Sequence, residues 1–216
     1  MSLLIFDLDG TLIDSRLDLA NAVNATRAHT GREPLEHTLI FSYVGNGAPV
    51  LIRKALGEAA PQEEVDAALQ FFLGWYRAHA VVHTVLYPGV FESLVSLHEA
   101  GHKLAVLTNK PVRISHEIMR HFELSHLMMK VYGGNSFAQK KPHPVGIDTL
   151  RAEAGVTQEA TWMVGDSSVD ILTARAAGVS ACGVTYGFQP ETLSDPVPDL
   201  LCHQFEEFAD HVLRLS

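Results

Sequence analysis

The sequence has little cysteine, no long apolar run and a shortage of positive charge. Its 216 residues include two cysteines, too few for the disulfide framework of a small secreted domain. Cys182 and Cys202 both stand among apolar neighbours, so we expect buried thiols in a reducing compartment. No apolar stretch approaches the ~20 residues of a membrane span, and an apolar run that begins at Leu3 leaves no room for a signal peptide. We therefore expect a cytoplasmic protein with no membrane partner.

Basic residues are outnumbered by acidic ones. The chain has 16 Lys and Arg against 25 Asp and Glu, a formal charge of −9. This balance argues against nucleic acid as the main partner. An anionic substrate would need local cations, a metal ion or helix N-termini. Hydrophobic residues make up 47% of the chain, enough for a core, and the length suits one large domain or two unequal ones.

The start of the chain combines an expected buried strand with two carboxylates. Four apolar residues, 3–6, run directly into Asp7-Leu8-Asp9-Gly10-Thr11. A continuous apolar run is typical of a strand buried on both faces of a parallel sheet. The period of two along a strand points Asp7 and Asp9 to the same side, at the edge where open α/β sheets bind ligands. Carboxylates this close repel each other unless a cation or proton lies between them, so the sequence predicts a positive partner.

Two patterns divide the rest of the chain. Residues 15 to about 81 show helical periodicity alone, over a length too great for an ordinary loop. From Tyr87 onward, predicted strands alternate with predicted helices, which implies a parallel sheet with helices on both faces. We therefore predict an α/β fold in which residues 1–14 and 82–216 form a Rossmann-like core and residues 15–81 form a small all-α domain inserted after the first strand. The predicted strands are 3–6, 103–108, 128–132, 161–164 and 180–185.

Polar motifs follow four of these strands. Each motif alone is also typical of a turn or a helix cap. Because the carboxyl ends of parallel strands meet at one edge of a sheet, their common position indicates a single site. The motifs are Asp7-Leu8-Asp9-Gly10-Thr11, Thr108-Asn109-Lys110, Lys140-Lys141-Pro142-His143-Pro144 and Gly165-Asp166-Ser167-Ser168-Val169-Asp170.

Together these motifs resemble the haloacid dehalogenase superfamily of phosphohydrolases, and the resemblance covers essentially the whole chain. The opening motif is similar to the first motif of that family, Thr108 to its second, Lys141 to its third, and Asp166 with Asp170 to its fourth. The all-α segment resembles the cap domain of the family's first cap class. The resemblance implies a core with the fold of this superfamily and phosphoryl-transfer chemistry.

The same resemblance implies hydrolysis through an aspartyl-phosphate. Asp7 would be the nucleophile, and Asp9 would be the general acid and then the general base. Magnesium would be held by Asp7, the backbone carbonyl of Asp9 and Asp166, since this hard cation prefers oxygen ligands. The dehalogenases and phosphonatases of the superfamily lack a carboxylate at the position of Asp9, so its presence favours a phosphate ester as substrate.

Further residues would surround the phosphoryl group. Thr108 and the backbone N–H of Asn109 would hold its oxygens, and Lys141 would add a fixed positive charge during catalysis. Asp170 would orient Lys141 or metal-bound water, and Thr11 would fix the loop that carries Asp9.

The inserted segment is expected to set substrate preference. Residues 43–56, 108–111 and 185–188 are similar to the corresponding stretches of phosphoglycolate phosphatases. Gly45 and Gly47 would let backbone N–H groups approach a small anion, and Arg53 would pair with a carboxylate. An alternative of equal weight is that Gly45-Asn46-Gly47 is a tight turn between helices and that Arg53 lies on a solvated face.

The predicted function is therefore the Mg²⁺-dependent hydrolysis of a small phosphorylated metabolite by a monomer or homodimer, with 2-phosphoglycolate as the expected substrate. Alternatives are other small substrates (sugar phosphates or pyrophosphate), a sugar-phosphate mutase and a non-enzymatic phospho-ligand sensor. Mutase relatives tend to carry a His just after the first turn, where this chain has Ser15-Arg16-Leu17-Asp18-Leu19. The presence of both Asp7 and Lys141 argues against a sensor.

Overall fold

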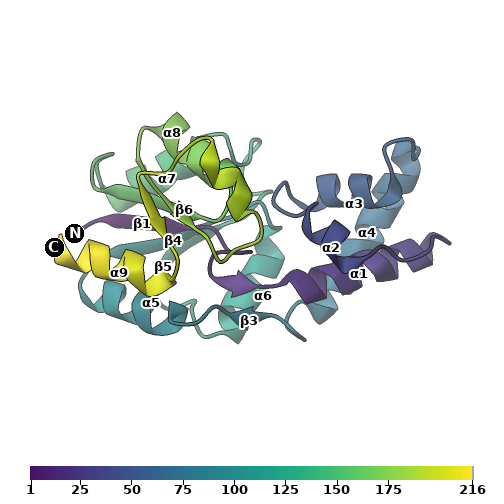
Figure 1. Ribbon diagram of the computed structural model, residues 1–216, viewed down its shortest axis with the longest axis horizontal. Coiled ribbons are helices and arrows are strands. Elements are labelled where there is room, and N and C mark those ends of the chain that lie inside the picture. The colour runs from purple at the N-terminus through teal and green to yellow at the C-terminus, as the bar shows by residue number, and fades with distance from the viewer. Residues whose placement is uncertain (216) are drawn as a thin grey trace. The chain divides into compact units, whose positions relative to one another are not determined.

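The computed structural model describes residues 1–215, which form two compact units (Figure 1). The first comprises Met1–Asp14 and the chain from Leu86 onward, and the second comprises Ser15–Val85. The sequence placed the end of the inserted segment at residue 81. The later boundary has a physical reason, because Asp18 accepts backbone hydrogen bonds from His83 at 2.9 Å and from Thr84 at 2.8 Å. These bonds attach the returning chain to the second unit.

The first unit contains a six-stranded sheet in which the paired strands are parallel, with the order β5-β4-β1-β6-β7-β8. After β1 the chain adds β4 and β5 toward one edge of the sheet. It then adds β6, β7 and β8 on the other side of β1, toward the opposite edge. The strand order thus reverses at β1, and ligands bind at the carboxyl ends of strands beside such a reversal. The strands are β1 (Leu3–Phe6), β4 (Lys103–Leu107), β5 (Met128–Tyr132), β6 (Thr161–Gly165), β7 (Ser180–Val184) and β8 (Leu200–Cys202).

Helices cover both faces of this sheet, as Figure 1 shows for α7 and α8 on one side and α5 and α9 on the other. The predicted α/β architecture is therefore confirmed. Three elements beyond the last predicted strand, η1, β8 and α9, were missed. Strand β8 is difficult to predict because it is only three residues long and follows Pro196 and Pro198. The helices of the first unit are α5 (Val90–Glu99), α6 (Val112–His121), α7 (Val145–Ala154), α8 (Ser168–Ala177), the 3₁₀ helix η1 (Pro190–Ser194) and α9 (Phe205–Arg214).

Strand β1 is buried on both faces, as its apolar run predicts. All four of its side chains are inaccessible to solvent. Leu3 and Ile5 belong to the core cluster that includes residues of α7 and α8. Phe6 faces the other way, where its ring centroid lies 5.6 Å from that of Phe205 and 6.0 Å from that of Phe208 in α9. This burial fixes the direction in which the chain leaves the strand at Asp7.

The second unit is helical. Its longest helix, α4, packs against α1 and α3, and α2 packs against α1. Phe72 and Tyr76 of α4 are fully buried, with stacked rings 5.5 Å apart. The helices are α1 (Arg16–His29), α2 (His37–Phe41), α3 (Ala48–Leu56) and α4 (Gln62–His79), and the short strands β2 (Ile13–Asp14) and β3 (Val85–Leu86) lie where the chain passes between the units.

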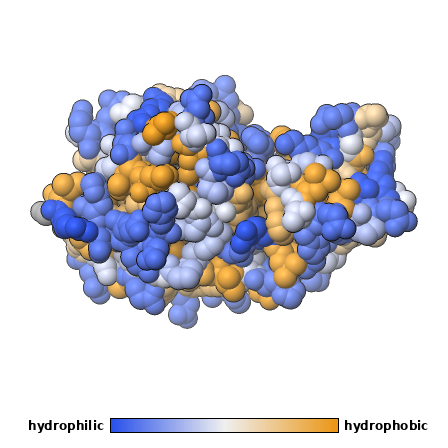
Figure 2. Space-filling view, in the orientation of Figure 1, coloured by the Kyte–Doolittle hydropathy of each residue, from blue (hydrophilic) through white to orange (hydrophobic). Residues whose placement is uncertain are grey.

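The exposed large apolar side chains of the described residues come from many different elements. On the face drawn in Figure 2, hydrophobic residues are broken up by hydrophilic ones. Exposed apolar side chains include Val82 in the second unit and Val197 in the first, and such scattered residues are normal for globular proteins. Within residues 1–215, no helix combines the length and the apolar character that crossing a membrane requires.

Candidate active site

The site begins where β1 ends. The backbone N–H of Asp7 still donates to Val164 of β6 at 2.9 Å, and Leu8 N–H then donates to Asp7 Oδ1 at 2.7 Å. The chain turns at Gly10, which has a φ of +81°. A Cβ atom at this glycine would lie 2.2 Å from Asp166 Oδ2, so both the turn and the carboxylate beside it require glycine.

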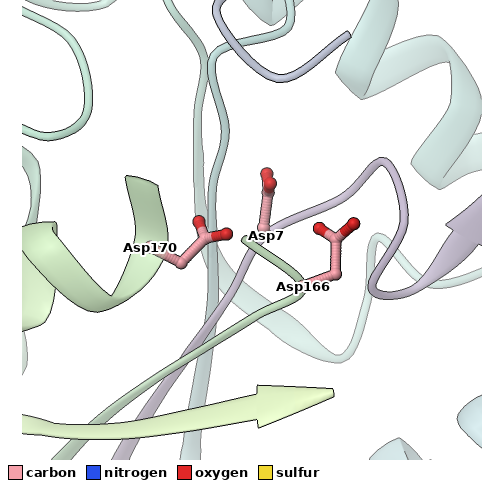
Figure 3. A group of neighbouring side chains, drawn as sticks. All are labelled: Asp7, Asp166 and Asp170. Carbon is pink, nitrogen blue, oxygen red and sulfur yellow. The ribbon is translucent and has the colours of Figure 1, made fainter. Parts of the chain in front are cut away.

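Three carboxylates from separate elements converge at this end of the sheet (Figure 3). Asp7 follows β1, Asp166 follows β6 and Asp170 belongs to α8, and one oxygen of each lies within 4.8 Å of the others. All three residues are buried. Burial is the main cause that raises the pKa of Asp7 to about 6 and the pKa of Asp166 well above its ordinary value. Carboxylates in this situation are stabilised by a bound cation or by protonation.

Lys141 supplies a positive charge inside this group. Its Nζ lies 2.6 Å from Asp170 Oδ1 and 3.0 Å from Asp7 Oδ1, and its side chain is 1% exposed. Burial lowers the pKa of Lys141, but the charges of Asp170 and Asp7 outweigh burial and leave the pKa above its ordinary value. The ammonium group is therefore fixed and charged next to the Asp7 carboxylate.

The contacts of Asp170 distinguish its role from those of the other two carboxylates. Its Oδ1 accepts from Lys141, while its Oδ2 accepts from Ser167 N–H at 3.2 Å and from Ser167 Oγ at 2.9 Å. The bond from Ser167 N–H is one half of the capping box that begins α8, and the other half runs from the backbone of Asp170 to the Ser167 side chain. Asp170 is thus the carboxylate that ties Lys141 to the start of α8, which fits the role of orienting Lys141 that the sequence predicts for it.

The loop that follows β7 contacts the Asp166 side chain. Phe188 N–H donates to Asp166 Oδ2 at 2.6 Å. A Cβ atom at Gly187 would lie 2.2 Å from the Cβ of Asp166 and 2.4 Å from the carbonyl oxygen of Gly10, so this loop packs closely on the first motif. Thr11 contributes from its own loop, with Oγ1 3.5 Å from Asp166 Oδ1. The sequence predicts that Thr11 fixes the loop of Asp9, and the structure adds this contact with Asp166.

Thr108 and Asn109 follow β4 and are buried. Lys110 N–H donates to Thr108 Oγ1 at 3.2 Å, so the Thr108 hydroxyl has its own proton available to donate elsewhere. The Asn109 side chain donates to the carbonyl oxygen of Lys141 at 3.2 Å and thereby ties the second motif to the third. The structure thus brings together the predicted residues of the first unit.

Lys110 is a charged partner of Asp9 that the sequence did not predict. Lys110 Nζ lies 2.8 Å from Asp9 Oδ1 and 3.1 Å from Asp9 Oδ2. The side chain of Lys110 is 2% exposed and that of Asp9 is 14% exposed, so this ion pair is largely shielded from water. The only sequence signal was the position of Lys110 in the Thr-Asn-Lys motif after a strand.

The predicted substrate residues Gly45 and Arg53 belong to the second unit. Gly45 has a φ of +109°, as expected for a turn between α2 and α3. The Arg53 guanidinium donates to the carbonyl oxygen of Ala60 and to the Gln62 side chain. These contacts lie within the second unit and favour the alternative in which Arg53 does not pair with a substrate carboxylate, although the side chain is half-buried and not on a fully solvated face.

The charges of the site suit a divalent cation. Four carboxylates and two ammonium groups lie among these contacts, which leaves two negative charges to be balanced when all are ionised. The carboxylate oxygens are hard metal ligands of the kind that Mg²⁺ and Ca²⁺ prefer. The carboxylates are those of Asp7, Asp9, Asp166 and Asp170, and the ammonium groups are those of Lys110 and Lys141.

Known proteins are similar to this chain in sequence and in fold. Residues 4–184 match the family described as haloacid dehalogenase-like hydrolase. A phosphoglycolate phosphatase from Colwellia psychrerythraea is 41% identical over 191 residues, which cover 86% of this chain and 84% of the relative. One from Aliivibrio fischeri is 37% identical, covering 95% of this chain and 94% of the relative. The crystal structure of a predicted phosphoglycolate phosphatase from Haemophilus somnus matches with a TM-score of 0.92 at 32% identity, over 100% of this chain and 98% of the other.

Proposed function

The chain belongs to the haloacid dehalogenase-like hydrolases, and from this premise we propose that it hydrolyses 2-phosphoglycolate to glycolate and phosphate through a phosphorylated Asp7. The predicted membership of this family is confirmed, and the chain is a phosphoric monoester hydrolase. The observation that carries the proposed mechanism is the buried contact of Asp7 with Lys141 at the carboxyl end of the central strand. This contact supports the proposal, because the proposed nucleophile lies beside a fixed positive charge at the edge of the sheet where open α/β folds bind ligands.

In the first step, an Asp7 carboxylate oxygen attacks phosphorus. A bond forms between that oxygen and phosphorus while the bond from phosphorus to the glycolate oxygen breaks. Asp9 gives its proton to this leaving oxygen, which would otherwise depart as a strongly basic alkoxide. The Thr108 hydroxyl and the Lys141 ammonium hold the phosphoryl oxygens as charge develops on them.

In the second step, water removes the phosphoryl group from Asp7. Asp9, now ionised, takes a proton from the water as its oxygen attacks phosphorus. The bond between phosphorus and the Asp7 oxygen breaks, which releases phosphate and restores both carboxyl groups to their starting states. Using Asp9 as acid and then as base lets one residue serve both steps.

A divalent cation, which we propose is Mg²⁺, would be held by the carboxylates of Asp7 and Asp166 and by the backbone carbonyl of Asp9. Bound there, it supplies charge neutralisation between the carboxylates and a phosphate dianion. Asp166 suits this role, because backbone and hydroxyl donors fix its side chain while burial disfavours its ionised form without a cation.

The substrate is proposed from the relatives, whose names specify phosphoglycolate. We propose that the second unit is a cap that contributes to substrate choice, as its position after the first motif suggests. Because the guanidinium of Arg53 is engaged with Ala60 and Gln62, we do not assign the substrate carboxylate to Arg53.

A panel of phosphate esters tests this proposal. The value of kcat/KM is measured with Mg²⁺ for 2-phosphoglycolate, sugar phosphates, pyrophosphate and p-nitrophenyl phosphate. We expect 2-phosphoglycolate to exceed every other natural ester by at least about tenfold. A flat profile would contradict the substrate, and formation of an isomeric sugar phosphate without free phosphate would indicate a mutase. Binding of these esters with no turnover would indicate a sensor.

A further inference from the structure

We propose that Lys110 is a positioning residue that holds the Asp9 carboxyl group in place for proton transfer to the leaving oxygen. The inference rests on the proposed function, because it requires Asp9 to be the general acid and base. It adds a second lysine to the machinery, with a role separate from that of Lys141.

The contact geometry supports this role. Lys110 Nζ is within hydrogen-bond distance of both Asp9 oxygens, at 2.8 and 3.1 Å. A contact with both oxygens restricts rotation of the carboxyl group as well as its position. Only 2% of the Lys110 side chain is exposed, so water competes little for its ammonium group. A general acid gains most when it is held within a fraction of an ångström of its productive geometry.

The backbone of Lys110 is itself firmly placed. Its N–H donates to Thr108 Oγ1 at 3.2 Å, and its carbonyl oxygen accepts from Gly134 N–H at 2.9 Å. A Cβ atom at Gly133 would lie 2.6 Å from that carbonyl oxygen, and one at Gly134 would lie 2.4 Å from the carbonyl oxygen of Asn109. The two glycines after β5 therefore let a second loop pack directly against the loop of Lys110. This support makes the lysine a fixed point from which Asp9 can be oriented.

The two lysines contact different carboxylates. Lys141 contacts the proposed nucleophile Asp7 and the helix residue Asp170, whereas Lys110 contacts the proposed acid Asp9. Each of the two reacting carboxyl groups thus has its own ammonium group. Loss of Lys110 should therefore disturb proton transfer while leaving the nucleophile and its partner in place.

A comparison of kcat/KM between esters with different leaving groups isolates the effect of Lys110 on proton transfer. An alkyl ester such as 2-phosphoglycolate needs a proton on its leaving oxygen, whereas p-nitrophenyl phosphate releases a stabilised phenolate without one. We expect Lys110→Met to lower kcat/KM about 10²-fold for 2-phosphoglycolate and less than tenfold for p-nitrophenyl phosphate. Glycerol 2-phosphate, an alkyl ester without a carboxylate, should show the larger loss as well.

A burst experiment checks the second step. Because Asp9 also activates the water that cleaves phosphorylated Asp7, this step should slow in Lys110→Met even with the aryl ester. Rapid mixing with p-nitrophenyl phosphate should then release about one equivalent of nitrophenol quickly, followed by slow turnover. Steady release at the final rate from the start, without a burst, would contradict the role of Lys110 in this step.

Variants of Asp9 and Lys130 provide the controls. Lys130→Met removes a lysine that is 45% exposed in β5, and activity should be unchanged. Asp9→Asn should show the same dependence on the leaving group as Lys110→Met, and the double variant should be no worse than Asp9→Asn if Lys110 acts through Asp9. Should Lys110→Met fail to fold, Lys110→Gln carries the same comparison of esters.

Three results would overturn the inference. Equal losses of kcat/KM for alkyl and aryl esters would show that Lys110 acts on the phosphoryl group or on the fold. A loss confined to 2-phosphoglycolate, without one for glycerol 2-phosphate, would show that Lys110 binds the substrate carboxylate. If Asp9→Asn itself lacks the dependence on the leaving group, the proposed role of Asp9 fails first, and this inference fails with it.

Discussion

Lys141 and Asp170 form an ion pair closed to solvent, with Nζ 2.6 Å from Oδ1 and side-chain exposures of 1% and 0%. The same carboxylate closes the capping box of α8 through Ser167. Removing its charge would therefore affect the orientation of Lys141 and the start of a helix together. Breaking one side of a buried pair costs far more than breaking an exposed one, because a buried charge is left without compensation.

Asp170→Asn is expected to lower the free energy of unfolding by about 3 kcal/mol and to reduce kcat at least tenfold. Urea unfolding and steady-state kinetics measure the two effects. Asp148→Asn is the matched control, since Asp148 pairs with Arg151 at 3.6 Å on the surface and should cost less than about 0.5 kcal/mol. Similar stability losses in the two variants would contradict the importance of the buried pair.

Asp7→Asn should lower kcat at least about 10³-fold with any phosphate ester, since an amide is a much weaker nucleophile than a carboxylate. Acid-quenched wild-type enzyme should carry one phosphoryl group during turnover, and the variant should carry none, as measured by intact-protein mass spectrometry. Activity near that of the wild type would rule out Asp7 as the nucleophile.

Removal of metal ions should silence the enzyme, and added Mg²⁺ should restore it. A readout that does not depend on catalysis is the midpoint of thermal unfolding, which Mg²⁺ should raise in the wild type and raise much less in Asp166→Asn. Asp199→Asn is the control, because this partly exposed carboxylate pairs with Arg175 outside the site and should leave the rise intact. If chelation changed neither the activity nor the midpoint of thermal unfolding, the proposal of a metal site would be wrong.

The pKa of Asp7 predicts a pH dependence of stability for the metal-free protein. Burial is the largest cause that raises this pKa from 3.8 to about 6, so the folded state binds a proton more readily than the unfolded state. The contribution of Asp7 to stability is then full below about pH 4 and is lost as pH rises through about 6. The loss amounts to at most about 3 kcal/mol, at ~1.4 kcal/mol per pH unit.

The Asp7→Asn variant isolates this group from the other carboxylates, because asparagine does not titrate. Without metal, the variant should gain stability relative to the wild type as pH rises from about 4 to 6, and the difference should level off above that range. Urea unfolding at several pH values measures the difference. A constant difference across this range would contradict the raised pKa.

Gly187→Ala should weaken metal binding about tenfold or more, because the added Cβ would meet both Asp166 and the backbone at Gly10. The Mg²⁺ concentration at half-maximal activity and the thermal shift with Mg²⁺ measure the effect. Gly74→Ala offers a control in the middle of α4, where an added Cβ meets nothing within 4 Å. That substitution should stabilise the protein by about 0.5–1 kcal/mol and leave metal binding unchanged.

The features that sequence predicted well are local in origin. The apolar run of β1 indicates burial on both faces, and the motif that follows it identifies Asp7 without reference to other segments. The same holds for the Gly165-Asp166 turn after β6, since a strand end and its polar residues are adjacent in the chain. Parallel topology then brings such strand ends together, so the predicted residues of the first unit meet as expected.

The features that sequence missed depend on side chains that meet over long separations. Lys110 reaches Asp9 across 101 positions, and no local pattern specifies which carboxylate a buried lysine contacts. The packing of Gly187 against Asp166 likewise follows from the arrangement of the loops after β6 and β7. Strand β8 escaped detection because three residues at a sheet edge carry too little periodicity.

The central position of β1 has a consequence for synthesis of the chain. The strand is synthesised before both of its neighbours in the sheet, since its register pairs Leu3 with Lys103 of β4 on one side and with Thr161 of β6 on the other. A nascent chain that has not reached β6 therefore leaves one edge of its most apolar strand open, and an open edge of this kind invites pairing with another molecule. Pairing over such long separations slows folding, so the surroundings of Asp7 are completed only after β6 has been made.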